Sequence, residues 1–258
     1  MKTIGILGGM GPEATVLLMQ KVIAARPARD DADHVPLLVD QNTQVPSRVR
    51  HLIDQTGDDP APVLAAMALR LQVAGVHALA MPCNTAHHYA PAIRAAVSIP
   101  LIDMVALSVS HAANLAPPNG TVGILASPAV RLTGLFDCAF AAVGLTAIYA
   151  QDDDDVLSVI RRIKADGPVL DARHALAELS RGLVTRGAQL QMIACTEFSL
   201  IADALDAPVS SFDTLDRLVE GILDFSTATE KDQDRADSRP PTVAATVRQY
   251  LPNKETTQ

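Results

Sequence analysis

The chain opens with the run Ile4-Gly5-Ile6-Leu7-Gly8-Gly9-Met10-Gly11-Pro12, and 118 residues later it contains the related run Val122-Gly123-Ile124-Leu125-Ala126-Ser127-Pro128. A second pair recurs at a similar offset, because Met81-Pro82-Cys83-Asn84-Thr85 returns after 112 residues as Ile193-Ala194-Cys195-Thr196-Glu197. Self-similarity at a nearly constant spacing indicates that one structural unit occurs twice, with loops of slightly different length. The sequence therefore predicts two similar lobes related by a pseudo-two-fold axis.

Short β-branched or Leu-rich runs alternate with stretches of helical apolar spacing throughout the chain. This alternation is typical of βαβ units that build a parallel sheet. Strands are expected at 3–7, 35–40, 77–81, 101–103, 121–125, 146–149, 189–193 and 209–211. Helices are expected at 13–25, 60–74, 86–96, 105–115, 128–142, 152–165, 171–185 and 213–224. The predicted fold is α/β, with a mainly parallel sheet flanked by helices in each lobe and the active site in the cleft between the lobes.

The repeat divides the chain into four expected segments. They are a first lobe at 1–103, a second lobe at 104–211, a closing helix at 212–225 and a polar tail at 226–258. We expect the closing helix to pack back on the first lobe. The tail has mixed charge and contains Pro240-Pro241, and a short helix is expected within it at Val243 to Tyr250.

Composition excludes several classes of function. The 258 residues carry a net charge of −8 and 3% aromatic side chains with no Trp, which disfavours binding to nucleic acid or to an anionic membrane surface. The apolar segment at the N-terminus is too short for a signal peptide or a membrane span, so a cytoplasmic location is expected. Three widely spaced cysteines do not suggest a disulfide framework, and Cys138, which lies outside both motifs, is expected to be structural.

The two motif cysteines, Cys83 and Cys195, each follow a predicted strand and precede a predicted helix start. Backbone N–H groups at such a position bind anions, and their positive field is expected to lower a thiol pKa toward neutrality. A single cysteine there is more often a small buried hydrophobe, but two at matched positions suggest shared chemistry. If the lobes face each other, the sulfurs flank one carbon, and a thiolate on one face and a thiol on the other can invert its configuration.

Three runs, Ile4 to Thr15, Pro82 to His87 and Cys195 to Glu197, together resemble the aspartate/glutamate racemase family, on its aspartate racemase branch, over roughly Met1 to Phe225. The resemblance implies racemisation of an acidic amino acid by a homodimer without pyridoxal phosphate or any other cofactor. It implies that Cys83 and Cys195 are the two acid/base residues. The family commonly has Gly before its second cysteine, whereas this chain has Ala194.

The resemblance also implies that Arg48 and Lys164 hold the side-chain carboxylate of the substrate. These cations are 116 residues apart, close to the offsets of the other repeated motifs. Arg48 is expected in a loop after Pro46-Ser47, where a guanidinium can bind a carboxylate bidentately. Lys164 is expected near the C-terminus of a helix.

The remaining expected substrate-binding residues are polar groups beside the cysteines, together with Met10 of the glycine-rich run. Asn84, Thr85 and Thr196 are expected to hold the α-carboxylate, although each side chain could instead cap a helix. Glu197 could orient groups near Cys195 or favour a helix start through its charge. His87 is expected on the surface of a helix, and Cys83 with His87 is too small a set for a metal site.

Three alternative functions remain open at this stage. The glycine-rich run with Asp40 at the end of the second strand suggests a nicotinamide-dependent dehydrogenase, but its glycines are not in the order Gly-x-Gly-x-x-Gly. Hydantoin racemisation or cis-trans isomerisation of a dicarboxylate would use the same two-cysteine scaffold. A non-catalytic binder of small dicarboxylates would bind aspartate without exchanging its Cα hydrogen.

Overall fold

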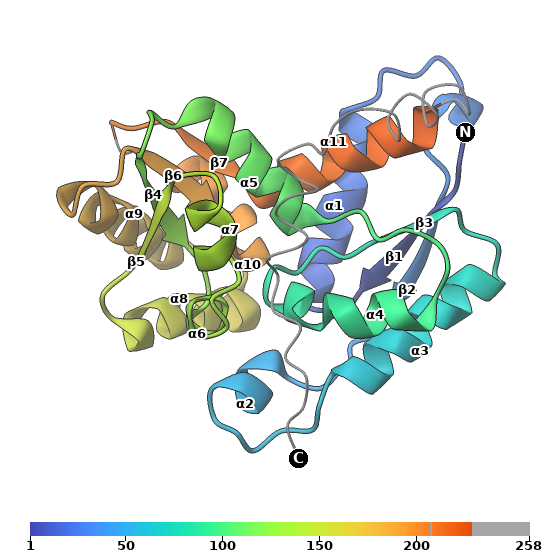
Figure 1. Cartoon of the computed structure of the whole chain (residues 1–258), viewed down its shortest axis with the longest axis horizontal. Coiled ribbons are helices and arrows are strands. Elements are labelled where there is room, and N and C mark those ends of the chain that lie inside the picture. The colour runs from blue at the N-terminus through green and yellow to red at the C-terminus, as the bar shows by residue number, and fades with distance from the viewer. Residues whose placement is uncertain (207, 229–258) are drawn as a thin grey trace.

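The two halves of the chain each form a parallel sheet, and the sheets lie in separate lobes that face each other (Figure 1). The computed structural model describes residues 1–206 and 208–228. The first sheet has the order β2-β1-β3 and the second the order β5-β4-β6-β7. The strands are β1 (Ile4–Gly8), β2 (Leu37–Gln41), β3 (Ala78–Ala80), β4 (Thr121–Leu125), β5 (Thr146–Tyr149), β6 (Leu190–Ile193) and β7 (Ser211–Asp213).

Strand order follows the sequence repeat. The two glycine-containing strands, β1 and β4, are each central, with β2 or β5 on one side and β3 or β6 on the other. At the position of β7 the first lobe has only a parallel bridge between Leu79 and Leu101. The strand expected at 101–103 was therefore wrong, because the chain turns at Asp103 into the next helix after a single bridged pair.

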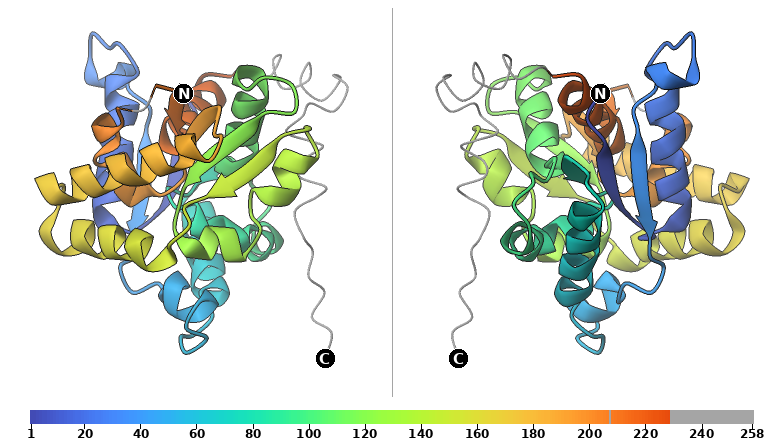
Figure 2. Two further views of the ribbon diagram at one scale, coloured as in Figure 1. Left: turned by 90° about the vertical axis from the view of Figure 1, so that its left-hand side faces the viewer. Right: turned by 90° about the vertical axis from the view of Figure 1, so that its right-hand side faces the viewer.

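Helices flank both sheets (Figure 2). In the first half they are α1 (Pro12–Ala24), η1 (Asp31–Asp33), α2 (Arg48–Leu52), α3 (Ala61–Val73), η2 (Thr85–Tyr89), α4 (Ala90–Ala96) and α5 (Met104–Leu115). In the second half they are α6 (Pro128–Leu132), α7 (Asp137–Ala141), α8 (Asp153–Asp166), α9 (Leu170–Thr185), α10 (Thr196–Ser199), η3 (Ala202–Ala204) and α11 (Thr214–Thr227).

Two expected helices are interrupted. The stretch 128–142 divides into α6 and α7 because Gly134 between them has a φ of 61°, a left-handed conformation that does not continue a helix. The stretch 86–96 begins as the 3₁₀ helix η2 and continues as α4, which has a proline in its first turn. The expected closing helix extends to Thr227, and the helix expected at Val243 to Tyr250 lies outside the described residues.

The repeated glycine of the central strands allows close packing of a helix in both lobes. A Cβ at Gly5 would lie 2.9 Å from Val76, and a Cβ at Gly123 would lie 2.9 Å from Ala188. Both distances are shorter than the closest approach of two carbon atoms. Val76 and Ala188 can therefore pack this closely against the central strand only because the strand has no side chain at the glycine. The glycine of Ile4-Gly5-Ile6 and of Val122-Gly123-Ile124 is therefore a packing requirement in both copies.

The last helix of each half packs on the other half. Helix α5 contributes Val105 and Val109 to the hydrophobic core around β4 and β6 of the second lobe. Helix α11 contributes Leu215 and Leu218 to the core around β1 and α1 of the first lobe. Helix α11, which begins at Thr214 rather than at 212 as expected, thus packs on the first lobe, and the starts of α5 and α11 lie near the middle of the molecule (Figure 1).

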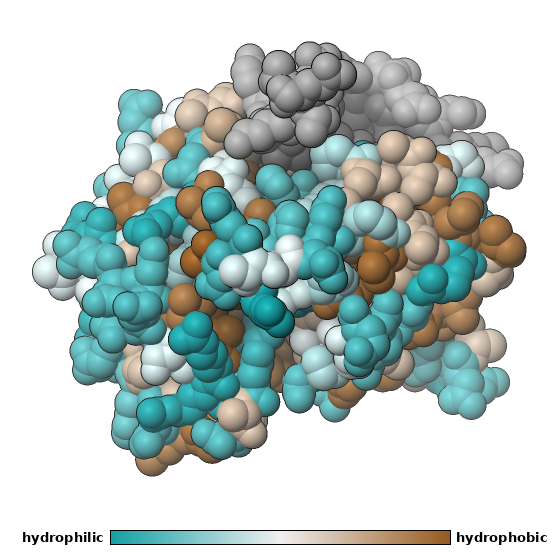
Figure 3. Space-filling model, turned by 90° about the horizontal axis from the view of Figure 1, so that it is seen from below, coloured by the Kyte–Doolittle hydropathy of each residue, from teal (hydrophilic) through white to brown (hydrophobic). Residues whose placement is uncertain are grey.

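On the face seen in Figure 3, hydrophilic residues spread across the surface and hydrophobic residues form separate patches between them. Among the described residues, no helix has both the length and the apolar character that crossing a bilayer requires.

Candidate active site

A small cavity lies between the lobes, with about 70 Å³ of space that a water-sized group can occupy. All nine residues that the sequence singled out line this cavity: Met10, Arg48, Cys83, Asn84, Thr85, Lys164, Cys195, Thr196 and Glu197. Five further residues also line it: Ser47, Val49, Ser127, Ile160 and Ala194. Of these, Ser127 could have been found from the repeat, since it matches Gly9 at the offset of 118.

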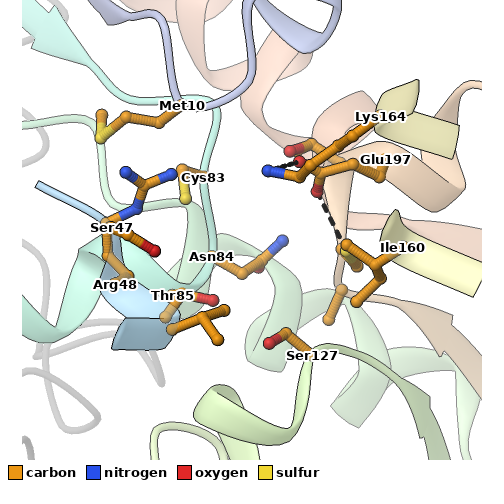
Figure 4. A pocket seen from close by; sticks show the side chains of 14 residues that line it. Met10, Ser47, Arg48, Cys83, Asn84, Thr85, Ser127, Ile160, Lys164 and Glu197 are labelled. Atoms are coloured by element: carbon orange, nitrogen blue, oxygen red, sulfur yellow. Dashed lines mark hydrogen bonds and ion pairs between the residues drawn. The ribbon is translucent and has the colours of Figure 1, made fainter. Parts of the chain in front are cut away.

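The two cysteines line the cavity from different lobes, and Figure 4 shows the first of them, Cys83. Cys83 follows β3 and is 7% exposed, and Cys195 follows β6 and is 6% exposed. Both therefore lie beyond the carboxyl end of a strand, where open parallel sheets bind ligands. Cys138, by contrast, is exposed on α7 and does not line the cavity.

Cys195 belongs to a chain of polar contacts. Its Sγ donates to Oε2 of Glu197 at 3.2 Å, and Oε1 of the same carboxylate pairs with Nζ of Lys164 at 2.9 Å (Figure 4). Glu197 therefore contacts the sulfur directly, and it also lies in the first turn of α10, so its position is compatible with both roles that the sequence left open. The matching position in the first half is Thr85, which carries no charge.

The expected lowering of the thiol pKa was wrong for Cys195. Burial raises the pKa of Cys195 well above its ordinary value, and the neighbouring carboxylate of Glu197 raises it further. The backbone N–H groups of Glu197 and Phe198, at the start of the four-residue helix α10, lower the pKa of Cys195. Their effect is smaller than the rise caused by burial and by the carboxylate. Cys195 is thus a protonated thiol that can donate a proton.

Arg48 is the first residue of α2, so the expected loop placement was wrong. Ser47 caps this helix by accepting from the N–H of Arg50 at 3.3 Å, which is the local signal that the sequence analysis missed. The guanidinium of Arg48 donates to the carbonyl of Pro46 at 3.1 Å. Within the described part of the chain it forms no ion pair.

Lys164 lies near the C-terminus of α8, as predicted, and its ammonium points into the cavity (Figure 4). Burial is the largest single influence and lowers the pKa of Lys164, but the charge and the hydrogen bond of Glu197, together with Cys195, outweigh it, so that the net change is upward. Arg48 opposes this rise, which means that the two cations repel each other across the cleft. An anion bound between them would relieve this repulsion.

Asn84 joins the first cysteine motif to the start of α11. Its Nδ2 donates to Oγ1 of Thr214 at 2.9 Å, while its Oδ1 is buried and has no partner within residues 1–206 and 208–228. A buried amide oxygen without a donor costs free energy unless a ligand supplies one. Thr85 and Thr196 line the cavity beside the two sulfurs.

His87 is buried, so the expected surface position was wrong. Its Nδ1 lies 2.9 Å from the carbonyl oxygen of Cys83, and its Nε2 accepts from the N–H of Met104 at 3.4 Å. Burial lowers the pKa of His87, although the nearby carboxylate of Asp103 acts against this. The ring is therefore neutral, with its proton on Nδ1.

The glycine-rich run contacts protein where a dinucleotide loop would leave space for phosphate. A Cβ at Gly8 would lie 2.7 Å from Thr15, and one at Gly9, whose φ is 90°, would lie 2.4 Å from the backbone of Asn42. A Cβ at Gly11 would lie 3.5 Å from Oε1 of Glu197, so this run also lies against the second cysteine motif. Its glycines therefore permit close packing between segments of the chain.

The described residues contain no group of three or more His, Cys, Asp or Glu side chains that could hold a metal ion. The chemically distinctive groups of the cavity are two thiols, two cations and one carboxylate.

Comparison with known proteins identifies relatives in both sequence and fold. Residues 7–222 match the model of the Asp/Glu/hydantoin racemase family. Over 216 residues the chain is 25% identical to the broad specificity amino-acid racemase RacX of Bacillus subtilis, covering 82% of this chain and 92% of that protein.

Solved structures share the two-lobe fold. An aspartate racemase of Picrophilus torridus matches with a TM-score of 0.78 at 23% identity, covering 91% of this chain and 98% of that one. A glutamate racemase of Francisella tularensis in complex with D-glutamate matches with a TM-score of 0.62 at 16% identity, covering 87% and 80%.

Proposed function

Because the chain belongs to the Asp/Glu/hydantoin racemase family and is an isomerase of the amino-acid racemase type, we propose that it racemises an acidic amino acid with two cysteines as acid and base. The observation that carries this proposal is the position of Cys83 and Cys195. They are equivalent in the sequence repeat, and they line one cavity together with Arg48 and Lys164.

The proton transfer uses the two sulfurs in different protonation states. In one direction of the reaction, Cys195, whose Sγ donates to Glu197, is the acid and Cys83 is the base; in the other direction the roles are reversed. The Cα–H bond of the substrate breaks, its proton forms an S–H bond with Cys83, and the electron pair is delocalised into the α-carboxylate. The S–H bond of Cys195 then breaks and its proton reaches Cα from the opposite face. The product is the other enantiomer, and the two sulfurs have exchanged protonation states.

The polar groups of the cavity are assigned by charge. Arg48, which has no carboxylate partner among the described residues, binds the side-chain carboxylate of the substrate, and Lys164 approaches the same group from the second lobe. Thr85 and Thr196 donate to the α-carboxylate, whose negative charge grows as the proton leaves. Nδ2 of Asn84 already donates to Thr214, so the contact of Asn84 with the α-carboxylate remains a prediction.

Chiral chromatography of aspartate and glutamate after incubation with the protein tests this function. We expect each L-enantiomer to yield its D-enantiomer and the reverse. Retention of configuration in both amino acids would contradict the proposal. A 5-substituted hydantoin and maleate should be assayed in parallel, because turnover of either would assign the same two cysteines to a different substrate.

Homodimer formation, a cytoplasmic location and activity without an added cofactor remain predictions. Light scattering of the purified protein measures its mass, and assays after exhaustive dialysis measure the dependence on a cofactor. A monomeric mass, or activity that returns only with pyridoxal phosphate, would contradict them.

A further inference from the structure

The residue four positions after each cysteine contacts the backbone of that cysteine. In the first half, His87 donates from Nδ1 to the carbonyl oxygen of Cys83 at 2.9 Å. In the second half, the backbone N–H of Ser199 donates to the carbonyl oxygen of Cys195 at 3.1 Å. His87 and Ser199 are 112 residues apart, which is the offset of the cysteines themselves. The contact is therefore part of the repeat.

A buried aspartate supports the first of these residues. Asp103 is 2% exposed, caps α5 by accepting from the N–H of Ala106 at 2.9 Å, and pairs with Arg94 at 2.6 Å. Its charge acts on His87, whose Nε2 accepts from the N–H of Met104, the next residue in the chain. The imidazole is thus held at both nitrogens, and its position depends on the start of α5.

The second half has an equivalent aspartate. Asp213 is 5% exposed, caps α11 by accepting from the N–H of Leu215 at 2.8 Å, and accepts from Oγ of Ser199 at 2.9 Å. It has no cation in hydrogen-bond contact, and its Oδ2 has no partner in the described part of the chain. The charged groups that act on it are Asp216 and Lys21, which pair with each other at 2.6 Å.

We propose that His87 and Ser199 are corresponding positioning residues that act by different contacts. His87, held at the start of α5 that Asp103 caps, fixes the backbone of Cys83 through its imidazole. Ser199, held by Asp213 through its hydroxyl, fixes the backbone of Cys195 through its own N–H. Neither residue lines the cavity, so each acts through its cysteine. The inference rests on the two-cysteine function proposed above, because the direction of a sulfur affects turnover only if that sulfur exchanges a proton with the substrate. A displacement of even 1 Å at a reacting group can cost about a hundredfold in rate.

The alkylation rates of the two thiols, measured in variants of His87 and Ser199, test the proposal without any substrate. The probe is iodoacetamide, applied to the full chain carrying Cys138→Ser, since Cys138 is an exposed thiol that would otherwise react. Peptide mass spectrometry gives the alkylation rate of each remaining cysteine. We expect His87→Ala to change the rate at Cys83 several-fold with little effect at Cys195, and Ser199→Ala to do the reverse.

Conservative variants separate positioning from loss of folding. His87→Asn keeps an amide N–H near the place of Nδ1, and Ser199→Thr keeps the hydroxyl that donates to Asp213. We expect both to restore the selective alkylation rates toward those of the parent, even if the alanine variants prove too unstable to assay. Equal changes at both cysteines, or failure of both conservative variants to restore the rates, would overturn the inference.

Primary deuterium isotope effects give the second measurement. The substrate is supplied as its two Cα-deuterated enantiomers, and the isotope effect is measured for each. Ser199→Ala should raise the isotope effect for the enantiomer whose proton Cys195 removes and lower it for the other enantiomer. His87→Ala should shift the ratio of the two isotope effects in the opposite direction. A general loss of structure would leave this ratio unchanged, and an unchanged ratio contradicts the inference. If the parent racemises neither aspartate nor glutamate, the proposed function fails, and the alkylation rates still decide the positioning role.

Discussion

The two halves of the molecule have similar backbone folds but different charges around their cysteine sulfurs. Cys83 and Cys195 occupy equivalent places after β3 and β6, but Thr85 in the first half stands where Glu197 stands in the second. Glu197 contacts the sulfur of Cys195 and pairs with Lys164, whereas Arg48 in the first half has no carboxylate partner among the described residues. The repeat thus places the two sulfurs at equivalent positions. The residues that differ between the halves give the two sulfurs different charged neighbours.

The largest expected effect comes from removing either sulfur. Cys83→Ser and Cys195→Ser should each lower racemisation about a thousandfold or more, because a hydroxyl at either place cannot replace a thiol as acid and base. Chiral chromatography measures the loss, and Cys138→Ser is the matched control, since Cys138 lies outside the cavity. Substantial turnover in both directions by either active-site variant would remove the need for two sulfurs.

The two cations should differ in the kinetic constant that they affect. Arg48→Ala should raise KM for acidic substrates by about ten- to a hundredfold, because an unpaired guanidinium is lost from the carboxylate site. Lys164→Ala should lower kcat as well, since it also leaves the carboxylate of Glu197 beside Cys195 without its partner. Identical changes in KM and kcat for the two variants would show that Arg48 and Lys164 have the same role, and would contradict this difference between the halves.

The buried aspartates should respond to pH in opposite directions. Burial raises the pKa of Asp213 from 3.8 to about 6, so its contribution to stability is present below about pH 4 and is lost as the pH rises through 6. Relative to Asp213→Asn, the wild type should therefore lose on the order of 3 kcal/mol of unfolding free energy between pH 4 and pH 8. Urea unfolding of both proteins at several pH values measures this difference.

Asp103 provides the opposite case. Burial acts to raise its pKa, but the N–H of Ala106 and the charge and hydrogen bond of Arg94 act to lower it, and its pKa lies below the ordinary value. Its contribution to stability is present above about pH 4 and is lost as the pH falls through the lower folded value. The advantage of the wild type over Asp103→Asn should therefore shrink in acid, and parallel pH profiles for the two variants would contradict the assignment.

The smallest expected effect is on the reactivity of one thiol. Glu197→Gln should lower the pKa of Cys195, because the carboxylate is removed while burial, the larger cause of the raised pKa, remains. The pH dependence of alkylation at Cys195 measures this change, and Thr85→Ser in the first half is the matched control. A Cys195 profile that does not move would show that Glu197 does not hold the proton on the sulfur.

Much of the fold could be predicted because the repeat and the apolar periodicity are local signals. Every observed strand overlaps an expected one, although β7 shares only Ser211 with the strand expected at 209–211. Both motif cysteines and the residues beside them line the cavity. Prediction from the sequence failed where tertiary contacts decide the structure. His87 looks like a surface residue of a helix until η2 packs against the start of α5, and the raised pKa of Cys195 depends on burial and on the side-chain direction of Glu197.

Short elements were the second source of error. The five-residue helix α2, which begins at Arg48, has too few residues for a periodic pattern, and only the cap by Ser47 indicates its start. The strand expected at 101–103 is a single bridge for a related reason, since the cap by Asp103 begins α5 at once. Helix caps therefore carry information that apolar spacing over a longer window does not.

Deuterium labelling during the first turnovers tests the central claim most directly. The protein is equilibrated in deuterated water, L-aspartate is added, and the Cα label of each enantiomer is followed by mass spectrometry after chiral separation. Two sulfurs on opposite faces predict that the newly formed D-aspartate carries deuterium while the remaining L-aspartate keeps protium. Deuterium that appears equally early in the remaining L-aspartate, or D-aspartate that retains the original proton, would contradict the account.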